Sequence, residues 1–105
     1  MIEPRDIEII AYYPSAQNPL CGSMHIRIIP KKIDIRDVRV IGRNKSICFL
    51  MPGRNIKDEA GEVTHFSYIQ FSDDRENRAF RIALKEAGRE FMIRFMLEQH
   101  VNNGK

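Results

Sequence analysis

Cationic side chains recur at intervals of three and four residues in the C-terminal third of the chain. They are Arg75, Arg78, Arg81, Lys85 and Arg89. In a helix, at about 100° per residue, these side chains share one flank, whereas Glu76, Glu86 and Glu90 share another. A helix whose charges serve only solubility more often pairs the two signs four residues apart. The segregated flank therefore predicts binding of nucleic-acid phosphates, and the alternative is a solvated helix face.

A second basic group surrounds residues 37–55. Its members are Arg36, Arg39, Arg43, Lys45 and Arg54. All of them except Arg36 are additional candidate nucleic-acid contacts, and the sequence leaves open which of them share a face with the helical flank. Aromatic residues close to basic ones could stack with the bases of a single strand. The candidates are Tyr12, Tyr13, Phe66 and Tyr68, and the alternative is that each lies in the core or on the sheet surface.

Residue types that would support enzymatic or metal chemistry form no recognisable pattern. The 3 histidines share no ligand spacing, and the 2 cysteines match no metal or redox spacing. Residues 51–55 lack the glycine spacing and the lysine of a phosphate-binding loop. No nucleophile is paired with a base in a known arrangement. We therefore expect no enzymatic activity, no cofactor, no metal and no small-molecule substrate.

Length and composition favour one globular domain that spans residues 1–105. The chain is 43% hydrophobic and 30% charged, with a formal net charge of +3, which is near ordinary usage. No apolar stretch approaches the roughly 18 residues needed to span a bilayer. The N-terminal segment carries acidic residues where a signal peptide carries basic ones. We therefore expect a cytoplasmic protein with reduced thiols, in which Cys48 is a small buried apolar residue.

Alternation of apolar and polar residues predicts an antiparallel sheet of about five strands between residues 6 and 71. The expected strands cover residues 6–13, 23–29, 33–41, 47–51 and 63–71. The short turn at residues 30–32 makes an antiparallel hairpin of the second and third strands. Within the third strand the apolar positions change from odd to even, which predicts a bulge near Arg36 and Asp37. The alternative is that both faces of this strand are partly covered.

The strand expected at residues 47–51 is apolar on both faces. Such a strand is typical of one that is covered on both sides. Because the chain has one long helix to cover a single face, the second cover could be another subunit. Pro52 has no N–H to donate, so it should end this strand, and a loop should follow at residues 53–62.

Residues 73–100 should form one long helix. Asp73 can cap its N-terminus, with Glu76 completing a pair that is similar to a capping box. The stripe that should cover the sheet consists of Phe80, Leu84, Ala87, Phe91 and Phe95. Gly88 is unfavourable in mid-helix, so it predicts either close packing or a bend. Met92 and Met96 continue the basic flank as a candidate partner contact; the alternative is that the last turns are buried all round.

The order of motifs in the middle of the chain resembles the stage V sporulation protein G (SpoVG) family of septation regulators. An Asp-Val-Arg-Val-Ile segment, a short polar turn and a strand that ends in Met-Pro before a basic residue carry the resemblance. The matching residues are Asp37, Arg39, Val40, Ile41, Phe49, Met51, Pro52 and Arg54. The hairpin at residues 21–35 and the pair Arg75–Glu76 are also similar to the family's.

This resemblance implies an α+β domain, with an antiparallel sheet and a C-terminal helix, that forms a homodimer and binds DNA or RNA as a regulator of septation or sporulation. The alternative is a protein-interaction module of the cell-division machinery that does not bind nucleic acid directly. The candidate dimer contacts are Ile47, Phe49, Met51, Met92 and Met96. Both readings place the protein in a bacterial cytoplasm.

Overall fold

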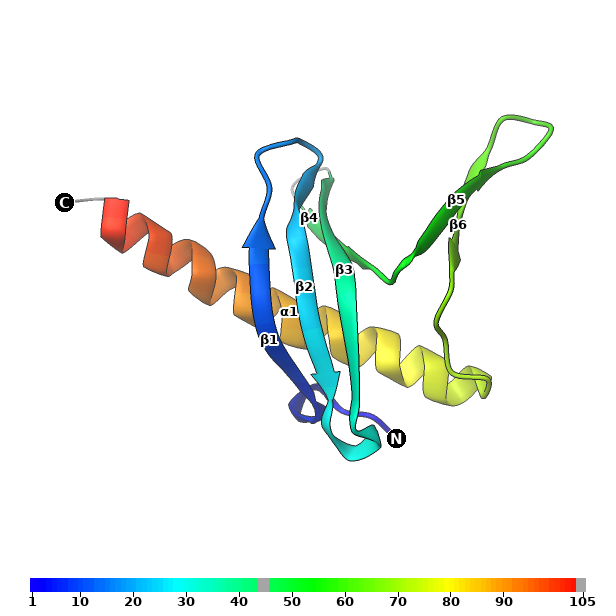
Figure 1. Cartoon of the computed structure of the whole chain (residues 1–105), viewed down its shortest axis with the longest axis horizontal. Coiled ribbons are helices and arrows are strands. Elements are labelled where there is room, and N and C mark those ends of the chain that lie inside the picture. Colours follow the sequence, from blue (N-terminus) through cyan, green and yellow to red (C-terminus); the bar gives the residue numbers. More distant parts are fainter. Residues whose placement is uncertain (44–45, 104–105) are drawn as a thin grey trace.

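The computed structural model describes residues 1–43 and 46–103 of the chain. Its elements are η1 (Pro4–Asp6), β1 (Ile7–Pro14), β2 (Leu20–Ile28), η2 (Ile29–Lys31), β3 (Ile33–Arg43), β4 (Ser46–Leu50), β5 (Gly53–Lys57), β6 (Val63–Ser67) and α1 (Asp74–Asn103). The first four strands form an antiparallel sheet in the order β1-β2-β3-β4, and β5 pairs with β6 in a separate sheet (Figure 1). The α+β architecture with a long C-terminal helix is therefore confirmed. The expected loop at residues 53–62 is wrong in part, because β5 occupies its first half.

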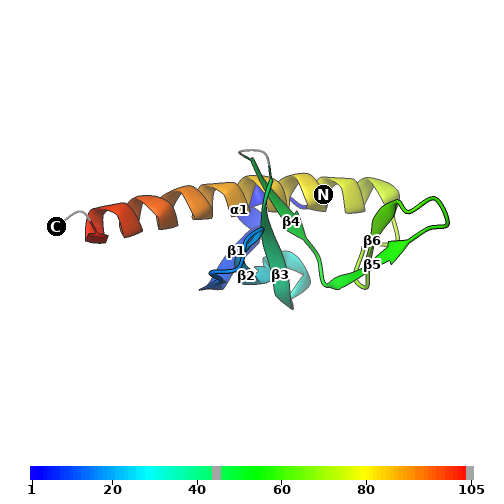
Figure 2. The same cartoon turned by 90° about the horizontal axis from the view of Figure 1, so that it is seen from above.

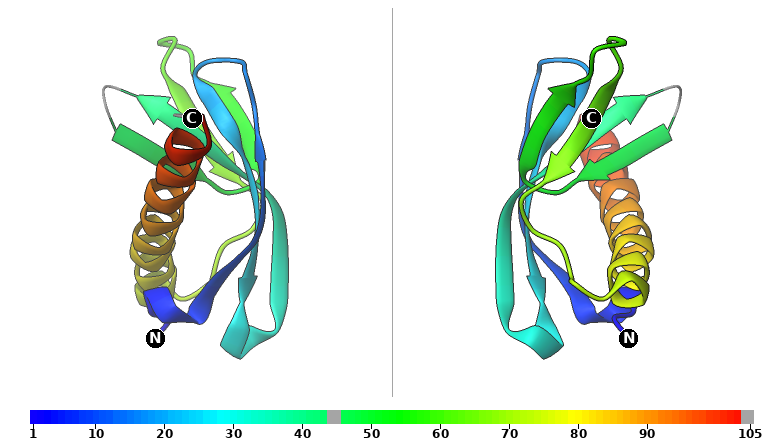
Figure 3. Two further views of the ribbon diagram at one scale, coloured as in Figure 1. Left: turned by 90° about the vertical axis from the view of Figure 1, so that its left-hand side faces the viewer. Right: turned by 90° about the vertical axis from the view of Figure 1, so that its right-hand side faces the viewer.

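The helix α1 lies along one face of the four-stranded sheet and extends beyond it at both ends (Figures 1 and 2). Seen along the helix, the sheet stands on one side of α1 (Figure 3). The core lies between them, and its most deeply buried side chains are Met24, Ile26, Ile28, Val38, Val40 and Phe80. The removal of these apolar surfaces from water is the main term that holds the helix on the sheet.

The expected bulge in β3 is confirmed. Two β3 residues, Arg36 and Asp37, lie opposite the single β2 residue His25. Asp37 has φ 61°, a left-handed conformation that Asp tolerates better than most residues. Because of the extra residue, Ile35 and Val38 both point toward the helix and are 3% and 0% exposed. The apolar positions of β3 therefore shift from odd to even residue numbers because of the bulge, and the strand has one buried face.

The helix begins as its sequence predicts and ends three residues later, at Asn103. A carboxylate oxygen of Asp73 accepts a hydrogen bond from the backbone N–H of Glu76 at 2.8 Å, which satisfies one of the free donors of the first turn. Phe80 and Leu84 are buried in the core, and Ala87 and Phe91 pack against it. Phe95, the last predicted member, is half-buried with its ring centroid 5.0 Å from that of Tyr12 on β1. The predicted apolar stripe is therefore confirmed.

The helix packs closely on β4 at Gly88. A Cβ atom at this position would lie 2.6 Å from two ring carbons of Phe49. Of the two expectations for Gly88, close packing or a bend, close packing is confirmed. The contact also shows that Phe49 faces the chain's own helix. Strand alternation then turns Cys48 to the opposite face, where it is exposed, so the expectation of a buried thiol is wrong.

Met92 lies one helical turn after Gly88 and is 2% exposed. The expectation that this side chain is free to contact a partner is wrong, because the buried arc of α1 is wider than the predicted stripe. Ala83 widens the arc on one side, and Gly88 and Met92 widen it on the side that faces β4. Met96, one turn further on, is 50% exposed.

The β5–β6 hairpin projects away from the four-stranded sheet (Figures 1 and 2). Pro52 ends β4 as expected, and the chain pairs again at once. A Cβ at Gly53 would lie 2.1 Å from the carbonyl oxygen of Phe66, so only glycine allows β5 to approach β6 this closely. The Met-Pro-Gly segment is therefore the joint between the sheet and the hairpin.

Candidate nucleic-acid interface

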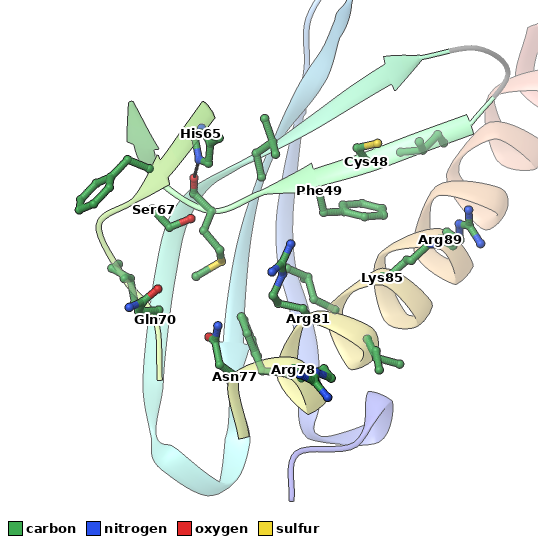
Figure 4. A pocket seen from close by; sticks show the side chains of 18 of the residues that line it. Cys48, Phe49, His65, Ser67, Gln70, Asn77, Arg78, Arg81, Lys85 and Arg89 are labelled. Carbon is green, nitrogen blue, oxygen red and sulfur yellow. Dashed lines mark hydrogen bonds between the residues drawn. The ribbon is translucent and has the colours of Figure 1, made fainter. Parts of the chain in front are cut away.

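An open cleft of about 840 Å³ lies between α1, β4 and the β5–β6 hairpin. Four basic residues of the predicted flank line its helical wall: Arg78, Arg81, Lys85 and Arg89 (Figure 4). All four are exposed. Arg75, the fifth member of the flank, is exposed near the start of α1 and does not line the cleft. We call the row from Arg78 to Arg89 the cationic row.

The floor of the cleft is β4, the edge strand of the four-stranded sheet. Ile47, Phe49 and Met51 line it, and all three also pack against the chain's own core. On the face of β4 that points toward the helix, α1 itself therefore covers these candidate dimer contacts. Among residues 1–43 and 46–103, β4 pairs only with β3, so its other backbone edge remains available for further pairing.

The wall opposite the helix comes from the end of the hairpin and the segment after it. Its polar side chains are those of His65, Ser67 and Gln70, and Asn77 adds another from the first turn of the helix (Figure 4). Hydroxyl and amide groups of this kind can donate hydrogen bonds to phosphate oxygens. Sequence reasoning missed His65, Ser67 and Gln70 because the inward face of the segment 63–71 could not be read from its pattern.

The cationic row carries positive charge that nearby carboxylates do not neutralise. Within residues 1–43 and 46–103, no member of the row belongs to an ion pair. The helix makes its i, i+4 ion pair on the other flank, where Arg94 donates to Glu90 at 2.6 Å. Asp74 is the acidic residue that lines the cleft, at the N-terminal end of the row. A cleft with one dominant sign of charge concentrates counter-ions of the opposite sign.

His65 ties the hairpin to the end of β4. Its Nε2 atom lies 2.9 Å from the backbone oxygen of Met51, and its Nδ1 atom lies 3.1 Å from Oδ1 of Asn55. Because a backbone carbonyl only accepts hydrogen bonds, Nε2 donates to Met51. The backbone N–H of Tyr68 adds a 2.8 Å bond to the carbonyl oxygen of Pro52. These bonds set the angle at which the hairpin leaves the sheet.

The second basic group is not gathered into one surface. Arg54 lies on β5, directly opposite Phe66. Arg39 is on the sheet face that points away from α1, with its Nε atom 3.9 Å from a carboxylate oxygen of Asp37. Arg43 is at the far end of β3. Lys45 lies outside the described residues.

A separate polar network lies on the sheet face away from α1. The carboxylate of Asp34 accepts hydrogen bonds from Arg27 at 2.6 and 3.0 Å, and it lies 2.9 Å from Nε2 of the buried His25. The bonds from Arg27, followed by the contact with His25, hold the pKa of Asp34 well below its usual range. This network joins β2 to β3 and does not line the cleft.

In the part of the chain that the structure describes, no cluster of three or more His, Cys, Asp or Glu side chains could hold a metal ion. The described residues also contain no helix that is long and apolar enough to cross a membrane. Comparisons of the chain with protein-family models, with curated proteins and with solved structures find no match.

Proposed function

We propose that the protein is a small dimeric regulator that binds DNA or RNA in the cytoplasm, with the phosphate backbone held by the cationic row. The observation that supports this most is the arrangement of the row. It spans twelve residues of α1, or eleven steps of about 1.5 Å and a length of about 16.5 Å, with about one positive charge in each helical turn. A nucleic-acid backbone presents regularly spaced negative charges, so it can follow such a row for several nucleotides.

Binding would be driven largely by the release of counter-ions as Arg and Lys replace them at the phosphates. Gln70, Asn77 and the hydroxyl of Ser67 would add hydrogen bonds to phosphate oxygens. These contacts position the nucleic acid and read little of its sequence. The resemblance of residues 37–54 to the SpoVG family supports the same class of function, and with it a role in septation or sporulation.

A homodimer would present the cationic row twice. Exposed apolar side chains on the hairpin and near the C-terminal end of α1 support self-association, because surfaces of this kind are usually covered in a partner complex. They include Val63 at 61%, Ile93 at 59% and Leu97 at 60% exposed. We expect light scattering at micromolar concentration to give twice the chain mass, and a monomer would overturn this part of the proposal.

Charge reversal of the row tests the nucleic-acid function. We expect the variant Arg78→Glu, Arg81→Glu, Lys85→Glu to lose binding of fluorescently labelled single-stranded DNA, duplex DNA and RNA while its circular dichroism and melting temperature stay close to those of the parent. The matched control reverses three exposed arginines outside the cleft, with the same change in net charge: Arg5, Arg36 and Arg94.

The control should keep most of the binding, and both proteins are titrated at two salt concentrations. If the row variant binds with an unchanged salt dependence, the cationic row is the wrong surface. Equal losses in the two variants would mean that only net charge matters.

The second candidate function is a protein-interaction module of the division machinery. The exposed patch of Ile93, Met96 and Leu97 and the free edge of β4 favour it, because both can bind a protein partner. Absence of nucleic-acid binding at low salt would select this alternative.

A further inference from the structure

The outer side of β4 opens into the cleft. Six consecutive residues, from Ser46 to Met51, line the cleft. Successive side chains of a strand point to opposite faces, so a cleft that met only one face would be lined by every second residue. The cleft therefore runs along the backbone edge of β4 and meets both of its faces.

This edge is free over the five residues of β4, Ser46–Leu50. Among the described residues β4 pairs only with β3, and in an antiparallel pair every second residue directs its N–H and C=O away from the partner strand. Past Leu50, the carbonyl oxygens of Met51 and Pro52 already accept hydrogen bonds from the β6 side of the hairpin. At about 3.4 Å per residue, the free edge is about 17 Å long.

The helix places positive charge beside this edge. Gly88 is the point at which α1 contacts Phe49 of β4. At about 100° per residue, the four members of the cationic row lie about 20–100° around the helix from Gly88, on the flank that lines the cleft (Figure 4). A strand added to the edge of β4 would therefore have cations in front of one of its faces.

An extended polypeptide that carries carboxylates fits both the edge and the charge. An edge strand offers N–H donors and C=O acceptors in alternation, and an added strand pairs with both. The phosphates of a nucleic acid only accept hydrogen bonds, so they would leave the carbonyl oxygens of the edge unpaired. Asp or Glu at every second position of the added strand would share the face that points toward α1.

A second copy of the chain fits this edge poorly. Pairing of β4 with β4 of another copy about a two-fold axis would place both helices on one face of the joined sheet. Each cationic row would then point toward the junction, and the juxtaposition of like charges is unfavourable. The homodimer proposed above is supported by other surfaces, on the hairpin and near the C-terminal end of α1.

We propose that the edge of β4 binds a partner protein through an extended acidic segment, which adds a fifth strand to the sheet and directs alternate carboxylates toward the cationic row. This partner site goes beyond nucleic-acid binding, and it can be tested without nucleic acid. Because both ligands would use the cationic row, the acidic segment and a nucleic acid would exclude each other from the cleft.

The test uses the full chain and two fluorescently labelled peptides of seven residues with blocked ends. One alternates glutamate with valine, and the other alternates lysine with valine. We expect fluorescence anisotropy at low salt to show binding of the glutamate peptide and none of the lysine peptide. Absence of binding of the glutamate peptide would overturn the proposal and leave nucleic-acid binding, which is titrated separately, unaffected.

Charge reversal locates the contact. The variant Arg78→Glu, Arg81→Glu, Lys85→Glu should lose the glutamate peptide and bind the lysine peptide instead, because the added strand now meets carboxylates. The control should keep the choice of the parent, since it has the same net charge and reverses three arginines outside the cleft: Arg5, Arg36 and Arg94. A row variant that still prefers glutamate, or a control that changes its preference, would overturn the proposal.

Hydrogen exchange of the β4 amides, followed by nuclear magnetic resonance, tests the strand pairing itself. The glutamate peptide at saturation should slow the exchange of alternate amides within Ser46–Leu50 by about 2- to 10-fold, the effect of one hydrogen bond at each. Peptide binding without this protection would mean attraction by charge alone, which overturns the added strand. Protection that is present without peptide and is lost on dilution would make the edge a contact between copies, which also overturns the proposal.

Discussion

The effect of Gly88→Ala on stability should change sign when Phe49 is removed. Helix propensity by itself favours Ala over Gly in mid-helix by about 1 kcal/mol. The new Cβ would however lie 2.6 Å from two ring carbons of Phe49, well inside the ordinary contact range of 3.4–4 Å. The ring must move by roughly 1 Å, and overpacking of this kind typically costs about 1–3 kcal/mol.

We therefore expect Gly88→Ala to leave the parent no more stable, or to destabilise it by up to about 2 kcal/mol. In a Phe49→Ala background the same change should stabilise the protein by about 1 kcal/mol, because no ring opposes the methyl group. The coupling energy between the two sites is then about 1–3 kcal/mol, the size of the overpacking term.

Urea denaturation followed by far-ultraviolet circular dichroism measures all four proteins of this cycle. The protein concentration must be held constant, since dimerisation would add to the apparent stability. Shifts in the midpoint at a constant m-value report the free energies. If Gly88→Ala stabilises equally with and without Phe49, the ring does not lie on Gly88, and the placement of β4 as the floor of the cleft is refuted.

Three further predictions concern other parts of the molecule. Because Arg27 lowers the pKa of Asp34 in the folded state, the ionised carboxylate stabilises the protein fully above the unfolded-state pKa of about 3.9 and progressively less below it. The melting temperature of Asp34→Asn should therefore lie below that of the parent at pH 7, and the gap should narrow as the pH falls from 5 to 2; a constant gap contradicts the assignment. Met92→Ala should destabilise the chain by about 2–5 kcal/mol in urea denaturation, as for buried Met generally, whereas Met96→Ala should change the stability of a single chain little. Lys85→Gln should reduce the slope of log Kd against log salt for single-stranded DNA by about 0.7, the contribution of one phosphate contact, and an unchanged slope would remove Lys85 from the interface.

Features that depend on near neighbours along the chain could be read from the sequence. The cap at Asp73 shows in the sequence as a capping residue, and the bulge at Arg36 and Asp37 shows as a shift of the apolar positions from odd to even numbers. Gly88 predicted either close packing or a bend, and only the contact with Phe49 decides between them. The cationic row can be read like the cap and the bulge, since the 3.6-residue period alone places Arg78 and Lys85 on one flank of the helix.

Features that depend on contacts between distant segments could not be read in this way. The strand β5 was missed because Arg54 to Lys57 show no apolar alternation; pairing with β6 makes them a strand, and that pairing needs the close approach allowed at Gly53. Cys48 was expected to be buried and is exposed, and Met92 was expected as a partner contact and is buried. Periodicity shows which side chains share a face of a strand or helix, but it does not show which face packs against the rest of the chain.

By itself, the sequence determined most of the elements, the charged flank of the helix and the end of β4 shortly before Pro52, because each follows from backbone preferences and periodicity within a few residues. Only the tertiary structure decided that the hairpin turns away from the sheet, so that a cleft opens in front of the cationic row with His65 and Ser67 on its opposite wall. The physical reason is that a cleft is made by surfaces more than a dozen residues apart. Their relative placement comes from packing against the shared core, which no local pattern encodes.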